Sequence, residues 1–355
     1  MRRAGPTASW ARGNTRLPVA RARSSATSSA SASSASRRAE PVNPSSVVPA
    51  KAGTHPSASP NETIGIGVGE PTHTRGPTEP WVPAFARTTE LRAEKLAAAG
   101  GVRIAGVELS EPLSPELKDA IWRAFLAHHI VVFPGQFLTR GQQFAFAGNF
   151  GEVEVHGAHR GEAKRYDVAH VMSNLDADGN PVLRVSKAAN YHWHTDKPYH
   201  AAPPMLTMLR AVEVPPTGGD TEFANTALAY DALPDETKWR IAGLRVVFRP
   251  AFDESRAAVD HPLVRMHPET GRKALYFGNH STHILGLPEA ESAALLGELL
   301  DHATQPQFVY RHRWRAGDLV MWDNRCLLHR LVADDSMRRY RRVMHRSVVR
   351  GTVPV

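Results

Sequence analysis

Residues 191–196 read Tyr-His-Trp-His-Thr-Asp and carry the pattern His194-x-Asp196. Side chains alternate between the two faces of a β-strand, so a strand here would place His194 and Asp196 side by side on one face. An imidazole and a carboxylate so placed are two of the three ligands of a 2-His-1-carboxylate site, which leaves positions on Fe(II) open for oxygen and an organic co-substrate. The pattern alone has little specificity, because the chain contains 18 histidines. His192 shares the same face and is a competing ligand at a longer spacing.

Three later residues make the pattern more specific. Thr221 lies 25 residues after Asp196, within the stretch Gly-Gly-Asp-Thr-Glu-Phe. His329 closes the stretch Trp-Asp-Asn-Arg-Cys-Leu-Leu-His, and Arg342 follows it by 13 residues.

In this order, the residues resemble the TauD/TfdA family of Fe(II)- and 2-oxoglutarate-dependent dioxygenases. The family pattern is His-x-Asp, then a threonine or serine, a distal histidine, and an arginine shortly beyond it. The resemblance runs from about Val102 to Arg350. It implies a mainly β fold with α additions, built on a double-stranded β-helix (jelly-roll) core.

The resemblance also implies roles for individual residues. His194, Asp196 and His329 would bind the iron and form the catalytic centre. Thr221 and Arg342 would hold the distal carboxylate of 2-oxoglutarate. Arg346 matches a family arginine near the keto-acid carboxylate and the substrate anion; if 341–349 is one strand, it shares a face with Arg342.

Three further matches concern the co-substrate and the primary substrate. His156 aligns with a substrate-binding histidine of the taurine-type branch. His159 falls where that branch has a tyrosine, which argues against taurine itself. Asn190 matches an active-site asparagine that would contact the co-substrate or the substrate.

The implied reaction uses Fe(II), with 2-oxoglutarate and O2 as co-substrates, and releases succinate and CO2. Arg346 and His156 favour a small anionic organic substrate, of the aryloxyalkanoate or alkylsulfonate kind. A metal-dependent hydrolase is the alternative, because two histidines and an aspartate also suit zinc. That reading leaves Thr221 and Arg342 without a role.

Local patterns predict the elements around these residues. Strands are expected at 102–109, 130–133, 317–322 and 341–349, and a hairpin turn at 266–272. Ser114 and Pro115 are typical of a helix start, and Thr139 with Gln142 forms a capping-box pattern. Helices are expected near 228–244 and 288–304. Many short strands with a few helices indicate a sandwich or barrel.

The first ninety residues differ from the rest in composition. Residues 21–40 contain eight serines, and eleven of the 27 prolines precede residue 90. A segment this polar cannot bury enough surface to offset its ordering entropy, so we expect residues 1–90 to be a disordered, low-complexity extension. The stretch from Val48 to Thr89 resembles the translation of an interspersed bacterial repeat, which indicates a start codon assigned too far upstream. The dioxygenase-like domain is expected at 91–355.

Charge and cysteine content exclude several classes of protein. The net charge is +8, but residues 1–90 hold 11 basic and 5 acidic residues, against 32 and 30 in the rest. The domain therefore has no electrostatic reason to bind nucleic acid. No apolar run is long enough to cross a membrane. Cys326 is the single cysteine, so no internal disulfide forms, and a cytoplasmic setting is expected. Cys326 lies three residues before His329, so the opposite strand parity makes it a poor fourth iron ligand. A homo-oligomer is left open.

Overall fold

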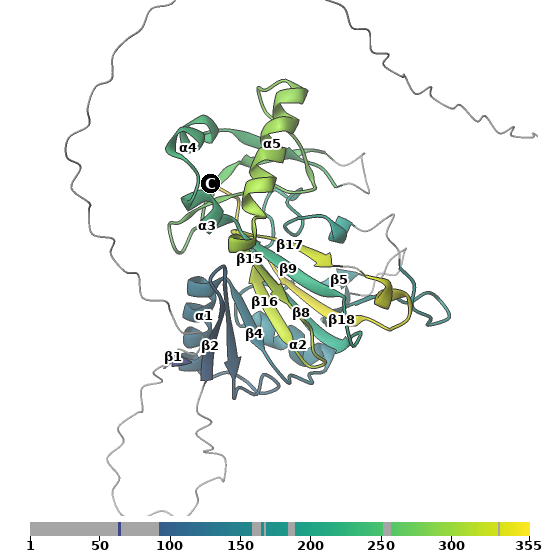
Figure 1. The fold of residues 1–355 in the computed structure, drawn as a ribbon. Coiled ribbons are helices and arrows are strands. Elements are labelled where there is room, and N and C mark those ends of the chain that lie inside the picture. The colour runs from purple at the N-terminus through teal and green to yellow at the C-terminus, as the bar shows by residue number, and fades with distance from the viewer. Residues whose placement is uncertain are drawn as a thin grey trace, which may run out of the picture. The chain divides into compact units, whose positions relative to one another are not determined.

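The computed structural model describes residues 63–64, 92–157, 165–166, 168–183, 189–250, 257–332 and 334–355. The chain divides into two units, of which the first, 1–56, lies wholly outside the described residues. The second unit, 57–355, holds the fold drawn in Figure 1. Apart from residues 63–64, the predicted disordered extension at 1–90 therefore lies outside what the structure describes.

Eight strands form one large sheet, in the order β1-β2-β3-β4-β16-β8-β18-β7. Their bounds are β1 Thr63–Ile64, β2 Arg92–Ala97, β3 Gly100–Ala105, β4 Ile130–Phe133, β16 Leu319–Asp323, β8 Leu206–Glu213, β18 Val343–Val349 and β7 His170–Ser173. All neighbouring pairs are antiparallel except β3 with β4. The predicted strand at 130–133 is confirmed, and the one at 102–109 ends earlier, at Ala105.

A second sheet of three antiparallel strands has the order β15-β9-β17. Its members are β15 Val309–His312, β9 Asp220–Asn225 and β17 Leu327–Val332. Phe223 of β9 and Leu327 of β17 belong to one buried cluster with Val320 and Trp322 of the large sheet. The two sheets thus share a core, as in a jelly roll.

Helices α1 (Pro115–His128) and α2 (Arg140–Gly148) pack on the other face of the large sheet (Figure 1). Strand β4 shows how the two faces are divided. Val131 and Phe133 belong to the cluster with α1 and α2, whereas Ile130 and Val132 belong to the cluster between the sheets. Each of these side chains is at most 1% exposed, and burying one stabilises the fold by roughly 1.5–3 kcal/mol.

The two helix starts follow the local rules. The Ser114 hydroxyl accepts a hydrogen bond from the Leu117 amide at 3.2 Å, and Pro115 occupies the first turn. The capping box between Thr139 and Gln142 is present. Helix α1 ends at His129, whose φ of 61° lies in the left-handed region that histidine tolerates better than most residues.

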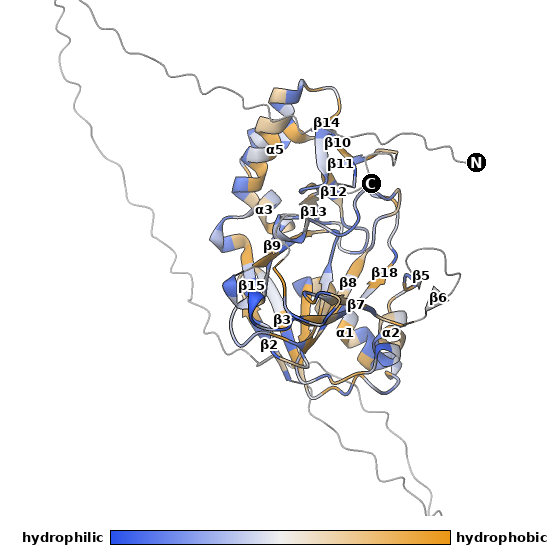
Figure 2. Ribbon diagram, turned by 90° about the vertical axis from the view of Figure 1, so that its right-hand side faces the viewer, coloured by the Kyte–Doolittle hydropathy of each residue, from blue (hydrophilic) through white to orange (hydrophobic). Residues whose placement is uncertain are grey.

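A third region carries the remaining helices and short strands. It consists of α3 Thr226–Asp231, α4 Asp235–Ile241, α5 Glu289–Ala303, β10 Arg245–Phe248, β11 Val259–Pro262, β12 Val264–Met266, β13 Lys273–Leu275 and β14 Ser281–Ile284. Hydrophobic and hydrophilic residues alternate along α5 (Figure 2), and Leu295 and Leu299 of this helix are buried. The hairpin predicted at 266–272 joins β12 to β13, with Gly271 at φ 68°.

The helix predicted at 228–244 is wrong as a single element, because the structure has two. Helix α3 ends at Asp231, and α4 begins after Pro234. Proline lacks an amide proton and restricts the residue before it to extended backbone, so the helix cannot continue through Leu233 and Pro234.

The short elements are β5 His156–Gly157, β6 Arg165–Tyr166, η2 Ala189–Tyr191, η3 Pro306–Phe308 and η4 Asp335–Arg338. Among the described residues, no helix combines the length and the apolar character needed to cross a membrane.

Candidate metal centre and co-substrate pocket

Two histidines meet through the main chain. The His194 amide donates to the His329 carbonyl at 3.0 Å, and the His329 amide donates to the His194 carbonyl at 2.7 Å. Their ring centroids are consequently only 4.1 Å apart. The expected strand at 191–196 is wrong in form: His194 makes an isolated bridge, and Asp196 sits in a bend. The side chains of His194 and Asp196 are nevertheless brought together, with one donor atom of each within 4.8 Å of the other.

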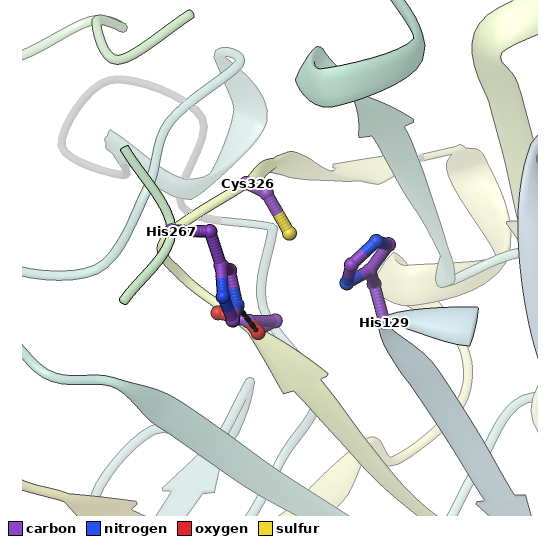
Figure 3. A group of neighbouring side chains, drawn as sticks. His129, His267 and Cys326 are labelled. Carbon is purple, nitrogen blue, oxygen red and sulfur yellow. Dashed lines mark hydrogen bonds and ion pairs between the residues drawn. The ribbon is translucent and has the colours of Figure 1, made fainter. Parts of the chain in front are cut away.

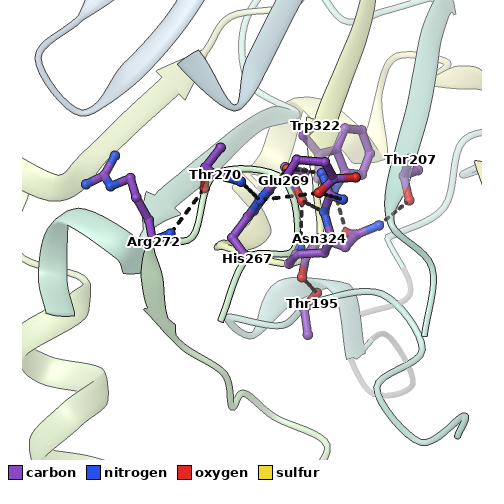
Figure 4. A network of polar contacts seen from close by, with 10 residues as sticks. Thr195, Thr207, His267, Glu269, Thr270, Arg272, Trp322 and Asn324 are labelled. Carbon is purple, nitrogen blue, oxygen red and sulfur yellow. Dashed lines mark hydrogen bonds and ion pairs between the residues drawn. The ribbon is translucent and has the colours of Figure 1, made fainter. Parts of the chain in front are cut away.

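The carboxylate of Asp196 is held by a chain of hydrogen bonds. The Thr207 hydroxyl donates to Asp196 Oδ2 at 2.6 Å, and Asn324 Nδ2 donates to the Thr207 hydroxyl at 2.9 Å. Trp322 Nε1 donates to Asn324 Oδ1 at 3.0 Å. Figure 4 shows Asn324 between Thr207 and Trp322, with the Thr195 hydroxyl bonded to the Asn324 carbonyl. This chain orients Asp196 and leaves its Oδ1 facing His329, at 4.0 Å from Nε2.

Burial sets the protonation states of this group. It lowers the pKa of His194 below its ordinary value, and it lowers the pKa of His329 to about 3, with the neighbouring His194 adding to the effect. Burial alone would raise the pKa of Asp196, but His329, Arg346 and the Thr207 hydrogen bond outweigh it and hold that pKa well below its usual range. At neutral pH the group therefore offers two neutral imidazoles and one carboxylate.

These residues fit a divalent iron ion. His194 Nδ1 lies 2.8 Å from the His192 carbonyl, which places its proton there and leaves Nε2 as the donor atom. One donor atom from each of His194, Asp196 and His329 lies within 4.8 Å of the others, and all three residues are buried. Two imidazoles and a carboxylate with free positions beside them are the donor set of non-haem Fe(II) oxygenases.

The predicted co-substrate residues line the same pocket as the three candidate ligands. The pocket is lined by Met172, Asn190, His194, Asp196, Leu209, Thr221, Trp322, His329, Leu331, Arg342 and Arg346. Thr221 lies on β9 and its hydroxyl accepts a hydrogen bond from Trp314 Nε1 at 3.0 Å. That bond fixes the oxygen and leaves the hydroxyl proton available to an acceptor in the pocket.

Arg342 is an unusual arginine, because it is 9% exposed yet has no ion pair among the residues that the structure describes. Its Nε donates to the Gly219 carbonyl at 3.1 Å, and its amide donates to Asn174 Oδ1 at 2.7 Å. Burial lowers the pKa of Arg342 to about 10, which still leaves the guanidinium charged at neutral pH. A buried cation without a counter-ion is costly, so the position is suited to an anion supplied from outside.

Arg346 lies on β18, closer to the candidate ligands. Its Nη1 is 3.8 Å from Asp196 Oδ1, and its Nε is buried without a hydrogen-bond partner among the described residues. The expected strand at 341–349 begins only at Val343, so Arg342 precedes it, and the pairing with β8 is irregular between Val343 and Met344. Both arginines line the pocket, but Arg342 does so from outside the strand, so the parity argument does not account for its position.

The predicted substrate residues are only partly described. Asn190 is exposed in η2 and lines the pocket. His156 begins β5, but its side chain lies outside the described residues, as does the whole of His159. Cys326, judged a poor iron ligand from strand parity, belongs to a different buried group, with His129.

Several residues of the site carry no signal in the sequence. Thr207, Asn324, Trp314 and Trp322 act on the candidate ligands or on Thr221 through hydrogen bonds between distant segments. A lone threonine or tryptophan has no diagnostic spacing. Only the positions of Trp322 and Asn324 within the stretch that ends in His329 pointed to this part of the fold.

Comparisons with known proteins agree with this geometry. The profile described as "Taurine catabolism dioxygenase TauD, TfdA family" matches residues 90–348. An alpha-ketoglutarate-dependent 2,4-dichlorophenoxyacetate dioxygenase of Cupriavidus pinatubonensis is 42% identical over 246 residues, which cover 63% of this chain and 86% of the relative. An (S)-phenoxypropionate/alpha-ketoglutarate-dioxygenase of Sphingobium herbicidovorans is 36% identical, with 72% of this chain and 93% of the relative covered.

Solved structures give the same result. A taurine dioxygenase from Burkholderia xenovorans superposes with a TM-score of 0.66 at 35% identity, covering 75% of this chain and 92% of the other. The structure of AAD-2 in complex with Mn(II) and N-oxalylglycine also has a TM-score of 0.66 at 35% identity, covering 74% of this chain and 98% of the other. The expected jelly-roll fold is thereby confirmed.

The fold and the family match define the class, that of jelly-roll dioxygenases dependent on 2-oxoglutarate. Within that class the chain belongs to the TauD/TfdA family, as the residues had indicated.

Proposed function

We propose that this protein is an Fe(II)- and 2-oxoglutarate-dependent dioxygenase that hydroxylates a small anionic organic substrate and releases succinate and CO2. Arg342 carries the proposal. The buried Arg342 guanidinium has no ion pair among the described residues and lines one pocket with Thr221, His194, Asp196 and His329. A charged guanidinium and a hydroxyl in such a pocket suit a co-substrate that has a carboxylate at each end.

Each residue of the pocket has a definite task in this proposal. His194, Asp196 and His329 would hold the iron, and Thr207 would keep Asp196 Oδ2 occupied so that Oδ1 is the ligand atom. Thr221 and Arg342 would bind the distal carboxylate of 2-oxoglutarate. Iron bound there would supply the oxidising chemistry that consumes O2 and 2-oxoglutarate and leaves a hydroxyl group on the substrate. The apolar lining, including Leu209 and Trp322, would exclude water from that chemistry.

Arg346 supports an anionic substrate. Arg346 lies within 3.8 Å of the candidate ligand Asp196 and still has an unpartnered Nε, so it can meet an anion close to the metal. Two of the relatives act, by name, on 2,4-dichlorophenoxyacetate and phenoxypropionate, and a third, from Pseudomonas putida, on a sulfate ester at 33% identity. We therefore place aryloxyalkanoates first and sulfur oxyanion compounds, including alkylsulfonates, second.

The hydrolase alternative is weaker. It accounts for two histidines and an aspartate, but it gives no task to the buried Arg342 or to Thr221. The relatives named above are dioxygenases, which adds no support for hydrolysis.

Two experiments test the proposal. Anaerobic protein with Fe(II) and 2-oxoglutarate should develop the weak visible charge-transfer band of keto-acid chelation. Alanine at His194, Asp196 or His329 should abolish it. His302→Gln is the matched control, because His302 is half-buried on α5 and, within the described part of the chain, forms a hydrogen bond with the Ala229 carbonyl and packs against the Phe308 ring, away from the pocket. A band of full strength in His329→Ala would refute the ligand set.

The second experiment identifies the substrate class. Succinate release is measured over aryloxyalkanoates, alkylsulfonates and alkyl sulfates. Hydroxylation next to the ether oxygen gives a product that falls apart into a phenol and an oxo acid, whereas hydroxylation next to a sulfonate gives sulfite and an aldehyde. Detection of the phenol or of sulfite together with succinate decides between the two classes.

A further inference from the structure

A second group of metal-binding side chains lies away from the pocket. His129, His267, Asp323 and Cys326 are all buried, and one donor atom of each lies within 4.8 Å of the others. None of the four lines the pocket that holds His194. Figure 3 shows the Cys326 sulfur pointing into the space between the rings of His267 and His129.

His129 is the observation that points to a ligand. Its side chain is 2% exposed, and neither ring nitrogen has a hydrogen-bond partner among the described residues. Buried polar groups are nearly always satisfied, so a fully orphaned imidazole needs an explanation. The ring is held at the end of α1 in the left-handed conformation at φ 61°, directed toward Cys326 and His267 rather than toward solvent.

His267 and Asp323 supply the other half of the group. The Thr270 amide donates to His267 Nδ1 at 3.3 Å, so the ring proton is on Nε2, which donates to Asp323 Oδ2 at 2.8 Å. Glu269 Oε2 lies 3.4 Å from Nδ1 on the other side of the ring. An imidazole between two carboxylates can bind a metal through one nitrogen in place of a proton. Its other nitrogen then donates a hydrogen bond to a carboxylate, as in metal-bound histidines.

We propose that His129, His267, Asp323 and Cys326 form a second metal site, which binds a divalent ion of the zinc class independently of the iron site. Two imidazoles, a thiolate and a carboxylate are a closed tetrahedral donor set of the kind that zinc prefers, and the thiolate makes the set unsuited to magnesium or calcium. With four protein ligands and no open position, the site is structural, and it would tie the end of α1 to the β12–β13 turn and the end of β16.

The protons and charges balance. On binding, the Cys326 thiol loses its proton to solvent, and the metal takes the place of the proton on His267 Nε2. The neutral ring then carries its one proton on Nδ1, which donates a hydrogen bond to Glu269 Oε2 in place of the bond that Nδ1 now accepts from the Thr270 amide. The thiolate and the Asp323 carboxylate then neutralise the dication, and no group changes oxidation state. Arg325 keeps Asp323 in place with bonds of 2.8 Å to each carboxylate oxygen and pairs with Glu269 at 2.6 Å. Burial and the Asp323 carboxylate raise the pKa of the Cys326 thiol, whereas the positive charges of Arg325, Arg272 and Arg265 act in the opposite direction and favour the thiolate.

The test uses the full chain and Co(II) as the probe. Thiolate-to-Co(II) charge transfer gives a near-ultraviolet band that imidazole and carboxylate ligands do not give. Because Cys326 is the only cysteine, that band in the wild-type chain identifies the site without any substitution. We expect two equivalents of Co(II) per chain, the thiolate band, and the strong visible absorption of four-coordinate Co(II). Zn(II) should displace Co(II) and so abolish the thiolate band, and it should raise the melting temperature of the protein.

Three variants show which site binds each of the two equivalents of Co(II). Cys326→Ala and His129→Asn should each lose one equivalent and the thiolate band; asparagine tolerates the left-handed backbone at 129. His194→Ala should lose the other equivalent and keep the band. His302→Gln, the control on α5, should keep both. A wild-type chain that shows no thiolate band, whether it binds one equivalent or two, would overturn the proposal, as would a band that disappears in His194→Ala. A single equivalent that gives the thiolate band would support this site and count instead against metal binding by His194, Asp196 and His329.

Discussion

His194 and His329 are joined by two main-chain hydrogen bonds, of 3.0 and 2.7 Å, although they come from distant parts of the chain. Their relative position is therefore set by the backbone and not by packing of the rings. Substituting either ring leaves the opposite one in place, so single variants at these positions report on the missing donor atom and not on a collapsed site.

Thr207→Val should weaken Fe(II) binding without removing a ligand. Valine has the shape of threonine but cannot donate to Asp196 Oδ2, and it leaves Asn324 Nδ2 buried without its acceptor. Loss of such an outer hydrogen bond costs roughly 10- to 100-fold in metal affinity. Competition with a chromophoric chelator measures the dissociation constant. Thr226→Val is the control, because the buried Thr226 hydroxyl has no described partner. Equal affinity in both variants would contradict the assigned role of Thr207.

Arg342→Ala should raise the apparent KM for 2-oxoglutarate. Removing the guanidinium leaves a desolvated carboxylate unpaired, which costs on the order of 2–5 kcal/mol, or roughly 30- to 5,000-fold in affinity. Arg342→Lys should recover only part, because an ammonium lacks the planar fork. Arg341→Ala is the matched control: this exposed neighbour pairs with Glu213 and is worth about 0–1 kcal/mol. If 2-oxoglutarate dependence is unchanged in Arg342→Ala, the co-substrate site is misplaced.

Arg346→Ala should affect the primary substrate more than 2-oxoglutarate. The Arg346 guanidinium lies 3.8 Å from Asp196 Oδ1, whereas the Arg342 guanidinium donates to the Gly219 carbonyl. We expect a higher KM for the substrate and succinate formed in excess of product, because a loosely held substrate is hydroxylated less often per turnover. The ratio of succinate to product, measured at saturating 2-oxoglutarate, checks this. A ratio that stays at the wild-type value would assign Arg346 to a structural role.

A chain that begins at Thr89 should fold and turn over like the full chain. The residues removed include β1, whose two residues make only a short pairing with β2. A chain that begins at Val102 should be less stable, because it also loses β2 and the buried Ala93. Melting temperatures and succinate release for the two shortened chains make the comparison. Failure of the Thr89 chain to fold would show that the extension contributes to the domain.

Acidification should destabilise the metal-free protein between about pH 6.5 and pH 4. Burial lowers the pKa of His129 to about 4, whereas its ordinary value is 6.5, so in this range the unfolded chain binds more protons than the folded one. The contribution of the neutral, buried His129 to the free energy of unfolding is therefore fully present above the pKa that His129 has in the unfolded chain. It falls as the pH drops below that value, by up to about 1.4 kcal/mol per pH unit for one such group. Urea unfolding at about pH 7 and pH 5 with a chelator present measures the slope, which His129→Asn should reduce and His302→Gln should leave unchanged.

Local signals predicted the elements that depend on neighbouring residues. The start of α1 and the capping box of α2 follow from side chains within three or four positions of each other, and β4 follows from its unbroken apolar run. The strand expected around His194 failed because its form depends on His329, which no local pattern reveals. The division at Pro234 was visible in the sequence and was outweighed by the apolar periodicity on both sides.

The candidate site followed from spacing and family resemblance, whereas its supporting residues did not. Thr207 reaches Asp196 from β8, and Trp314 reaches Thr221 from the end of β15. The residues around Cys326 also come from three separate segments of the chain. Strand parity could therefore exclude Cys326 as an iron ligand, but it could not predict that Cys326 lies close to His129. Contacts of this kind depend on how strands are ordered in the sheets, and that order is a property of the whole chain.

Side chains alternate along β4 between two separate hydrophobic clusters, so the residues of one cluster can be substituted independently of those of the other. Val131 and Phe133 anchor the helices, whereas Ile130 and Val132 face the second sheet, on the side of β8 and β16 where Leu209 and Trp322 reach the pocket. Substitutions that reshape the pocket for a different substrate leave the helical side intact. A lineage with this architecture can diversify its chemistry on one side of a sheet while retaining on the other the packing that keeps the chain folded.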